Sequence, residues 1–436
     1  MAATASADVL EAMLEKVHKN VTELFETSNT VAARIKRSGQ AEKLSEKLYR
    51  FPLLQYPGGV YGKYSADAGT MLNGSGPLIT KMTAAFLYSE YAFELGQQAI
   101  DLTDDNEKSV YNTKADTIGK AMDQLEAYDD IGFHDDGTGK LTEAASAGGA
   151  ASLTFAGATD YQGVSRLRQG QLCAVYNSSG TAYMTANHTI TAINRKSKAV
   201  TFSASFSETG AAGDYLVFPG ITTTPPVSFQ STYPATITAD DWRHGLRYFN
   251  DYTASRYVLG LLKSTVPELL PASVNASGDD ISFEHGQTML DELQDRRDED
   301  AIRGLWGLAH MTQRAKILAL SRHITSKFIT DSQVGKSVDQ QPTNNSYSST
   351  FDFCGIECTP DKRQMTNRMD FIVPEKWGRA IVKETGFMKN PGGGFIFQGR
   401  ASTGALKASI LFKITQGFDW FNQDPGCGGV IYGLGT

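Results

Sequence analysis

The first strong pattern of hydrophobic and polar positions lies in residues 8–37, where apolar side chains recur at alternating spacings of four and three. Its apolar members are Leu10, Leu14, Val17, Val21, Leu24, Val31 and Ile35, with one polar interruption at Ser28. This spacing predicts a helix with a narrow apolar stripe. The sequence allows two arrangements: the stripe packs on a neighbouring chain, or it packs on its own domain. A second short helix is predicted over residues 41–49.

Residues 56–102 follow a different pattern. The first part, YPGGVYGKYSADAGTMLNGSGPLITK, is rich in glycine and has neither helical nor alternating periodicity. The second part, MTAAFLYSEYAFELGQQAIDL, is apolar and aromatic enough to form strand. A glycine-rich excursion of this length is uncommon inside a compact domain and is usually functional or disordered. We interpret it as an extended arm that needs a partner surface.

The pattern then returns to helix and changes to strand. A long amphipathic helix is predicted over residues 104–129, packed on a sheet, and HDDGTGK after it is typical of a turn. Residues 141–220 lose charge and carry five short β-prone runs between turn signals, which indicates a small all-β module. Those runs are SLTF, QLCAVY, HTITAIN, AVTFSASF and DYLVF.

The remaining chain mixes both periods. We expect helices over 282–303 and 313–324, and a buried strand in 305–311. Further strands are predicted in 351–358, 369–377 and 406–423, and a last apolar strand lies near the C-terminus. The fold class is therefore α+β, with an inserted β domain and two excursions, the N-terminal helix and the arm.

Composition narrows the possible functions. The chain has 436 residues, enough for two or three domains, and its 41% hydrophobic and 20% charged content is that of a folded protein. The net charge of −7 disfavours a surface that grips nucleic acid. We expect no membrane span and no signal peptide. Four cysteines fit a reducing compartment.

Candidate chemistry is sparse. The sequence has no P-loop, no H-E-x-x-H and no G-x-S-x-G, and its histidines do not stand at metal-ligand spacing. His134, Asp135 and Asp136 could form a metal or acid/base cluster, but beside two glycines we expect an exposed turn. Cys354 and Cys358 could be a metal pair, but we expect two buried thiols on one strand face. The sequence therefore favours a structural or binding role, with no enzyme activity, cofactor or metal.

Several strings in their order resemble one family. They are RFPLLQYPGGVYGKYS with TKMTAAFLYSEYAFEL, then LRQGQLCAVYNSSGTAYMTANHTITAINRKSKAVTF, then HGLRYFNDYT, DFIVPEKWGRA and GFDWFNQDPGCGGVIYGL. Together they are similar to the major capsid protein of tailed bacteriophages, which has the HK97-type fold, in the branch with an inserted β domain. The resemblance implies an N-terminal helical arm (1–50), an E-loop with flanking strands (51–102), a spine helix (103–140), an inserted β domain (141–220), an axial domain (221–370) and peripheral-domain strands with the C-terminal segment (371–436).

The same resemblance implies a function. Many copies would assemble as pentamers and hexamers into an icosahedral shell that encloses double-stranded DNA without sequence-specific binding. A scaffolding protein, a portal and decoration proteins are the implied partners. The protein would then reside in the virion, after assembly in the host cytoplasm.

The resemblance also implies which residues contact neighbouring subunits. For the E-loop these are Tyr56, Gly58, Gly59, Tyr61, Lys63, Tyr64 and Met71. For the N-terminal arm they are Leu10, Leu14, Val17, Val21 and Leu24. Some members of the family cross-link through a loop lysine; we expect Lys63 to be an ordinary interface charge, because nothing in the sequence identifies the matching asparagine.

Two other functions are alternatives to a phage capsid. A cellular encapsulin-type compartment would have a similar fold, but the length and the β insertion argue against it. A carbohydrate-active enzyme or binding protein with a β accessory module would need paired carboxylates in a cleft. Its candidates, Glu284 and Asp291, fall on a predicted helix, which disfavours this reading.

Overall fold

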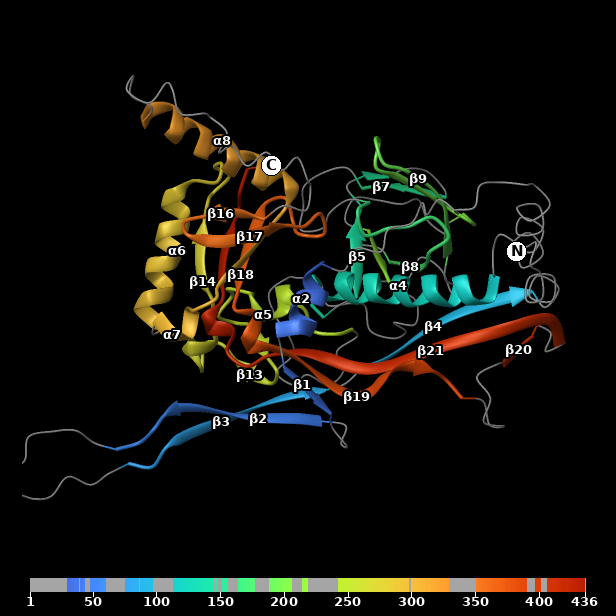
Figure 1. Cartoon of the computed structure of the whole chain (residues 1–436), viewed down its shortest axis with the longest axis horizontal. Coiled ribbons are helices and arrows are strands. Elements are labelled where there is room, and N and C mark those ends of the chain that lie inside the picture. Colours follow the sequence, from blue (N-terminus) through green and yellow to red (C-terminus); the bar gives the residue numbers. More distant parts are fainter. Residues whose placement is uncertain are drawn as a thin grey trace, which may run out of the picture.

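The computed structural model describes most of the chain (Figure 1). The described residues are 30–38, 40–43, 48–59, 75–85, 87–96, 113–137, 139–144, 146–147, 151–155, 164–176, 188–205, 214–218, 242–297, 299–328, 350–389, 397–400 and 406–435. Three sheets of five, seven and six strands, with their helices, form the body, and a two-stranded ribbon extends away from it. Within this part of the chain, no helix is long and apolar enough to cross a membrane.

The five-stranded sheet is long and narrow because one strand organises it. β21 (Leu406–Asn422) pairs along one edge with β19 (Trp377–Phe387) and then with β20 (Phe397–Arg400). β4 (Leu87–Gly96) pairs along the other edge. The strand predicted in 406–423 is therefore confirmed as β21, whereas the predicted strand 369–377 is interrupted by a 3₁₀ helix at Pro374–Lys376, after which β19 begins. The strands form a band that spans much of the molecule in Figure 1.

The short helix predicted over residues 41–49 is wrong. β1 (Gln40–Lys43) runs parallel to β19, with Ala41 opposite Arg379, and β2 (Leu48–Tyr56) already includes the end of that stretch. The sequence AEKLSEKLY has high helix propensity, but propensity is a weak preference that tertiary pairing overrides. Here the edge of β19 supplies backbone partners to β1.

The long amphipathic helix is confirmed. α4 (Thr113–Phe133) lies along the narrow sheet, and its Ala121 and Leu125 pack against Ile414 of β21. The helix continues to Phe133 instead of ending at residue 129, and its described part begins at Thr113. Since the apolar stripe of α4 faces β21, the helix stiffens the narrow sheet along its length.

The strands predicted in residues 141–220 are present and form the seven-stranded sheet, in the order β5-β11-β8-β9-β10-β7-β6. Their bounds are β5 (Lys140–Glu143), β6 (Ser146–Ala147), β7 (Ser152–Thr154), β8 (Leu172–Tyr176), β9 (His188–Asn194), β10 (Ala199–Phe202) and β11 (Tyr215–Val217). This sheet has its own hydrophobic core, which Ile131 of α4 joins.

The six-stranded sheet is mixed, in the order β14-β22-β18-β15-β17-β16. Its strands are β14 (Ala272–Asn275), β15 (Trp306–Ala309), β16 (Phe351–Phe353), β17 (Ile356–Pro360), β18 (Arg368–Ile372) and β22 (Gly429–Tyr432). The accompanying helices are α6 (Phe283–Arg296), α7 (Glu299–Ile302) and α8 (Met311–Phe328). The predicted helices near 282–303 and 313–324 and the buried strand in 305–311 are thus confirmed.

The expectation that Cys354 and Cys358 share one strand is wrong. The predicted strand 351–358 is a hairpin of β16 and β17 that turns at Cys354 and Gly355, both with positive φ. Cys358 is buried on β17, whereas Cys354 is half-buried in the turn. Burial raises the pKa of both thiols, and the two lie in different environments, so they do not form the paired face expected from one strand.

A central core joins the sheets. It combines residues of α2 (Thr30–Ser38), α5 (Leu246–Phe249), β12 (Tyr257–Val258) and the narrow sheet with three buried tryptophans, Trp306, Trp377 and Trp420. β13 (Leu261–Leu262) pairs with β12, and short 3₁₀ helices lie at Pro267–Leu269, Pro374–Lys376 and Pro425–Cys427. α2, the first described element of the chain, is therefore built into the body.

Candidate functional site

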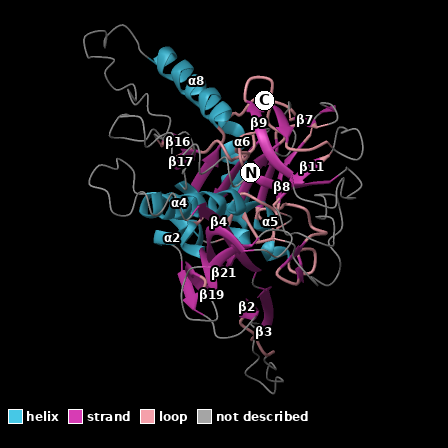
Figure 2. Ribbon diagram, turned by 90° about the vertical axis from the view of Figure 1, so that its right-hand side faces the viewer, coloured by secondary structure: helices cyan, strands magenta, loops and turns pink. Residues whose placement is uncertain are grey.

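A two-stranded ribbon carries several of the exposed large apolar side chains among the described residues. β2 and β3 (Leu78–Ala85) pair antiparallel and extend away from the body, as Figures 1 and 2 both show. Among the described residues, neither strand of this ribbon pairs with another strand. Beyond its base, the edges of the described ribbon are therefore open to a strand or loop from elsewhere.

The far end of the described ribbon is held by glycines. The amide of Gly59 donates to the carbonyl of Ser75 (2.9 Å), and the Tyr56 hydroxyl donates to the carbonyl of Gly59 (2.6 Å). Gly58 has φ +83°, and a Cβ atom there would lie 2.6 Å from the Ser75 carbonyl oxygen. Only glycine fits at that position, so Gly58 fixes where the two strands separate.

Large apolar side chains are exposed on the same half of the ribbon. Leu54 pairs with Ile79, and Tyr56 pairs with Leu78 across the two strands. Their exposed fractions are 61% and 53% for the first pair, and 48% and 55% for the second. A cluster of exposed apolar residues on one element marks a binding surface. We call these four residues the ribbon patch.

The near half of the ribbon is anchored in the body. Phe51 and Met82 face each other and are buried in the central core, where the Phe51 ring lies 5.8 Å from that of Phe421. The Thr83 amide donates to the carbonyl of Leu259 (2.9 Å). The ribbon thus has a base that is buried in the body and a far end that exposes apolar side chains.

The contact residues predicted from the sequence divide into two groups. Tyr56, Gly58 and Gly59 lie at the far end of the ribbon, as described above. The other predicted E-loop residues, Tyr61, Lys63, Tyr64 and Met71, and all predicted N-arm residues, Leu10, Leu14, Val17, Val21 and Leu24, lie outside the described residues. The sequence did not single out Leu54, Leu78 or Ile79, because each stands next to another apolar residue and no alternation with polar residues marks an exposed face.

α2 is tied to the body through a buried carboxylate. Asp130 of α4 accepts the backbone amides of Val31 (3.1 Å) and Ala32 (2.8 Å), which are N–H groups of the first turn of α2. Its other oxygen pairs with the guanidinium of Arg363, and both side chains are almost completely buried. A carboxylate at a helix N-terminus satisfies free amides and favours the helix dipole.

The exposed turn predicted at His134, Asp135 and Asp136 is wrong, because all three side chains are buried. The chain at Gly245 covers the end of α4 so closely that a Cβ there would lie 2.4 Å from the Asp135 carbonyl oxygen. Arg166 donates to the carbonyl of His134 (3.3 Å). Turn-like composition predicts a turn but does not decide whether another segment covers it.

His134 belongs to a buried ion-pair cluster. Its Nε2 lies 3.1 Å from Oδ2 of Asp361, which precedes Arg363 by two residues. Asp130, His134 and Asp361 offer ligand atoms within 4.8 Å of one another, a separation that suits a metal ion. However, the Arg363 guanidinium already lies on Asp130 and would repel a cation. We therefore interpret the cluster as a structural junction between α2, α4 and the loop that joins β17 to β18.

This junction predicts an acid dependence of stability. Burial opposes ionisation of Asp361, but His134 and Arg363 outweigh it and lower its pKa to about 2. A carboxyl with a lowered folded-state pKa stabilises the fold above its unfolded pKa, and this contribution is lost as the pH falls from about 4 towards 2. The free energy of unfolding, measured with denaturant, should therefore fall by about 2 kcal/mol more between pH 5 and pH 2 for the wild type than for Asp361→Asn.

Burial raises the pKa of the neighbouring Asp130, so protonation of Asp130 at low pH favours the folded state and opposes the effect of Asp361. Since both proteins contain Asp130, the difference between the wild type and Asp361→Asn reports the contribution of Asp361. Asp295→Asn is the control, since it removes an exposed carboxylate of α6. Parallel loss of stability with falling pH in the wild type and Asp361→Asn would contradict the prediction.

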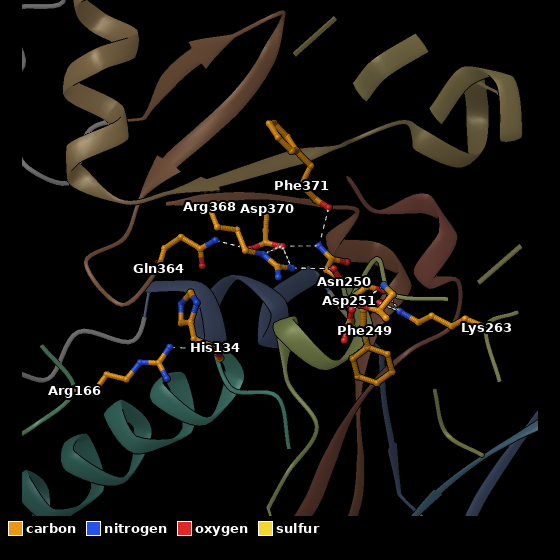
Figure 3. A network of polar contacts seen from close by, with 11 residues as sticks. His134, Arg166, Phe249, Asn250, Asp251, Lys263, Gln364, Arg368, Asp370 and Phe371 are labelled. Carbon is orange, nitrogen blue, oxygen red and sulfur yellow. Dashed lines mark hydrogen bonds and ion pairs between the residues drawn. The ribbon is translucent and has the colours of Figure 1, made fainter. Parts of the chain in front are cut away.

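A second buried network joins α5 to β18 (Figure 3). Arg368 donates to Asp370 (2.6 Å) and to the carbonyl of Asn250 (2.9 Å). The ammonium group of Lys263 donates to the carbonyls of Phe249 (3.1 Å) and Asp251, and burial lowers its pKa to about 7. These groups are occupied with one another, so the network holds the sheets together and offers little reactive chemistry.

The carboxylates weighed for carbohydrate chemistry do not form a pair in a cleft. Glu284 and Asp291 are both exposed on α6. By contrast, three of the buried charge pairs join segments far apart in the sequence: Asp130 with Arg363, His244 with Asp419 and Asp129 with Arg243. No local spacing reveals such pairs.

Comparison with known proteins shows a likeness in structure alone. No family model matches the sequence, and no curated protein matches it. Among solved structures, the capsid asymmetric unit of cyanophage A-1(L) superposes with a TM-score of 0.56 at 11% identity, and covers 98% of both chains. The capsid of a native GTA particle gives 0.49 at 8% identity, covering 97% of this chain and 95% of that one. An encapsulin complex from Synechococcus elongatus gives 0.42 at 7% identity, with 95% and 92% covered. At this identity the first likeness establishes the fold.

Proposed function

We propose that this chain, which has the HK97-type capsid fold expected from its sequence, is a structural shell protein that assembles with many copies of itself. The observation that carries the proposal is the ribbon, whose base is fixed in the body and whose end exposes the ribbon patch to a neighbour. Apolar side chains in such a position favour association because covering them removes apolar surface from water.

Assembly into a closed shell explains why individual contacts can be modest. Each subunit would lay its ribbon on the next, and many weak contacts around a closed symmetry sum to a stable particle. Beyond its base, the edges of the described ribbon are open, so it can also add backbone hydrogen bonds to a neighbour. We extend the proposal to pentamers and hexamers of an icosahedral virion shell, assembled in the host cytoplasm.

The net charge of the chain bears on what the proposed shell encloses. The net charge of −7 suits an inner surface that encloses double-stranded DNA without binding it tightly. A scaffolding protein, a portal and decoration proteins would complete the particle, as the resemblance implies. No enzyme activity is part of the proposal. An encapsulin-type compartment is the alternative within the same fold, and the packaged content distinguishes the two.

The test is electron microscopy of the purified protein. The full chain, expressed alone or with its scaffolding protein, should form closed, regular shells. Deletion of residues 58–76 should leave a folded subunit that forms none, because it removes the end of the ribbon and the segment beyond it. Normal particles from the deletion variant would overturn the role of the ribbon, and a wild type that stays monomeric in both settings would overturn the proposed function.

A further inference from the structure

A cavity of about 590 Å³ lies between α4, β4 and the start of the seven-stranded sheet. The segment before β8, residues 168–172, forms one side, and Trp242 with Arg243 forms another. Cavities of this size commonly hold a ligand or a side chain of a partner. Neither the ribbon nor the two buried networks uses this cavity, although Asp129 and Arg243 at its base pair with each other.

Aromatic rings give the cavity a defined shape. Phe218 stacks on Trp242 with ring centres 4.5 Å apart, and Tyr128 meets the edge of Phe218 at 5.8 Å. Tyr91 of β4 lies 6.2 Å from Tyr128. These rings come from four separate segments and support one another, so the cavity is formed before any partner binds.

The cavity is short of hydrogen-bond acceptors. Four lining residues have a buried nitrogen for which the structure shows no acceptor: Arg168 Nη1, Gln171 Nε2, Trp242 Nε1 and Arg243 Nε. No side-chain oxygen of the described lining residues is left without a donor in this way. The Trp242 nitrogen faces Gly132 of α4. The other three belong to side chains that line the cavity, where a small rotation of the side chain would turn the nitrogen towards a bound group. Buried donors without acceptors cost free energy, and an acceptor-rich group removes that cost.

Arg168 adds a positive charge for which the described residues supply no ion-pair partner. Its guanidinium lies 5.6 Å from the centre of the Tyr128 ring. Burial lowers its pKa, as do the charges of Arg363 and Arg195, whereas Tyr128 and Tyr91 act in the opposite direction. The other charges at the cavity differ, because Arg243 pairs with Asp129 (2.7 Å) and Glu90 pairs with Lys413 (2.6 Å).

We infer that this cavity receives an aspartate or glutamate side chain from a second copy of this chain, with Arg168 and Gln171 as its hydrogen-bond donors. A carboxylate supplies the missing acceptors and the missing negative charge together. The mouth of the cavity favours a protein over a free anion, since Leu172 at the mouth is 43% exposed and presents apolar surface. The inference rests on the proposed function, which brings copies together, and the chain has acidic residues in excess, 48 against 41 basic ones.

The direct test is chemical cross-linking of assembled particles of Arg168→Lys. This variant keeps the charge and places a primary amine in the cavity, which a carbodiimide joins to a carboxylate in contact with it. Particles are assembled from a mixture of ¹⁴N- and ¹⁵N-labelled subunits, and mass spectrometry of the peptides around position 168 shows whether a link joins two copies. The expected result is a mixed-isotope peptide that contains a single acidic partner residue.

Stability measurements provide a second test with a different readout. Arg168→Gln removes a half-buried charge that has no ion-pair partner among the described residues, so the melting temperature of the isolated subunit should stay the same or rise. The subunit concentration needed for assembly should rise about tenfold or more, because a charge-assisted contact between copies is lost. Lys196→Gln is the matched control, since it removes a positive charge from an exposed turn of the same sheet and should change neither quantity.

The outcomes separate the two proposals. Shells of the wild type together with only within-chain links, or no link, at position 168 would overturn the inference and leave the proposed function intact. An unchanged assembly concentration for Arg168→Gln would overturn it equally. A wild type that never assembles would overturn the proposed function and, with it, the second copy as the occupant.

Discussion

Leu54→Ser combined with Ile79→Ser is expected to suppress shell assembly while leaving the subunit folded. Both side chains are more than half exposed, so the isolated subunit loses little when they are replaced. In the proposed shell a neighbour covers them. Covering the exposed half of these two side chains contributes about 2–3 kcal/mol per subunit to the free energy of association. The critical concentration for assembly should therefore rise on the order of 30- to 100-fold, measured by sedimentation and electron microscopy.

Lys81→Ser is the matched control for this experiment. Lys81 is exposed on β3 of the same ribbon, opposite Pro52, but it adds little apolar surface. Its replacement should change the critical concentration only slightly. Circular dichroism and thermal unfolding of the double variant should match those of the wild type. Shells that form from the double variant at the wild-type concentration would show that the ribbon patch does not contact a neighbour.

Arg363→Met is expected to reduce the free energy of unfolding by about 3–5 kcal/mol, the loss typical of a broken buried ion pair. The change leaves Asp130 as a buried carboxylate without its counter-charge. Asp130 must then take up a proton or admit water, and either process weakens its bonds to the first turn of α2. Denaturant unfolding measures the loss, and hydrogen exchange at the amides of Val31 and Ala32 should accelerate.

Asp130→Asn in the Arg363→Met background tests the cause. The amide oxygen can still accept from Val31 and Ala32, and no charge remains in the junction from this pair. The double variant should therefore be more stable than Arg363→Met alone. Arg296→Met is the control, because it breaks an exposed i,i+4 pair with Glu292 and should cost less than about 1 kcal/mol. An Arg363→Met variant no less stable than this control would refute the role of the junction.

Elements with strong local periodicity were predictable from the sequence. Local periodicity predicts three kinds of element here: the helix α4 from its apolar stripe, β4 from its alternation, and the strands of the seven-stranded sheet from their short apolar runs. In each case the spacing of apolar residues indicates which face is buried. The helix over 41–49 fails for the opposite reason. AEKLSEKLY has no strong pattern, and the free edge of β19 decided its conformation.

The candidate site was predictable only in part. The glycine-rich composition of the arm located the ribbon, and Gly58 is required there because its left-handed φ and the Ser75 carbonyl leave no room for a side chain. The ribbon patch depends on something that the sequence does not state, namely how far the body covers β2 and β3. Phe51 and Leu54 are both apolar residues of β2, yet one is buried in the central core and the other is exposed.

The sequence by itself determined the class of the fold, most of its helices and strands, and the position of a glycine-rich arm. These follow from periodicity, glycine content and turn signals, which act over a few residues. Only the tertiary structure decided that the turn at His134 is buried, that Asp130 meets Arg363 and that Arg168 and Gln171 face a shared cavity. Burial and ion pairing depend on segments far apart in the chain, and no local pattern encodes which of them meet.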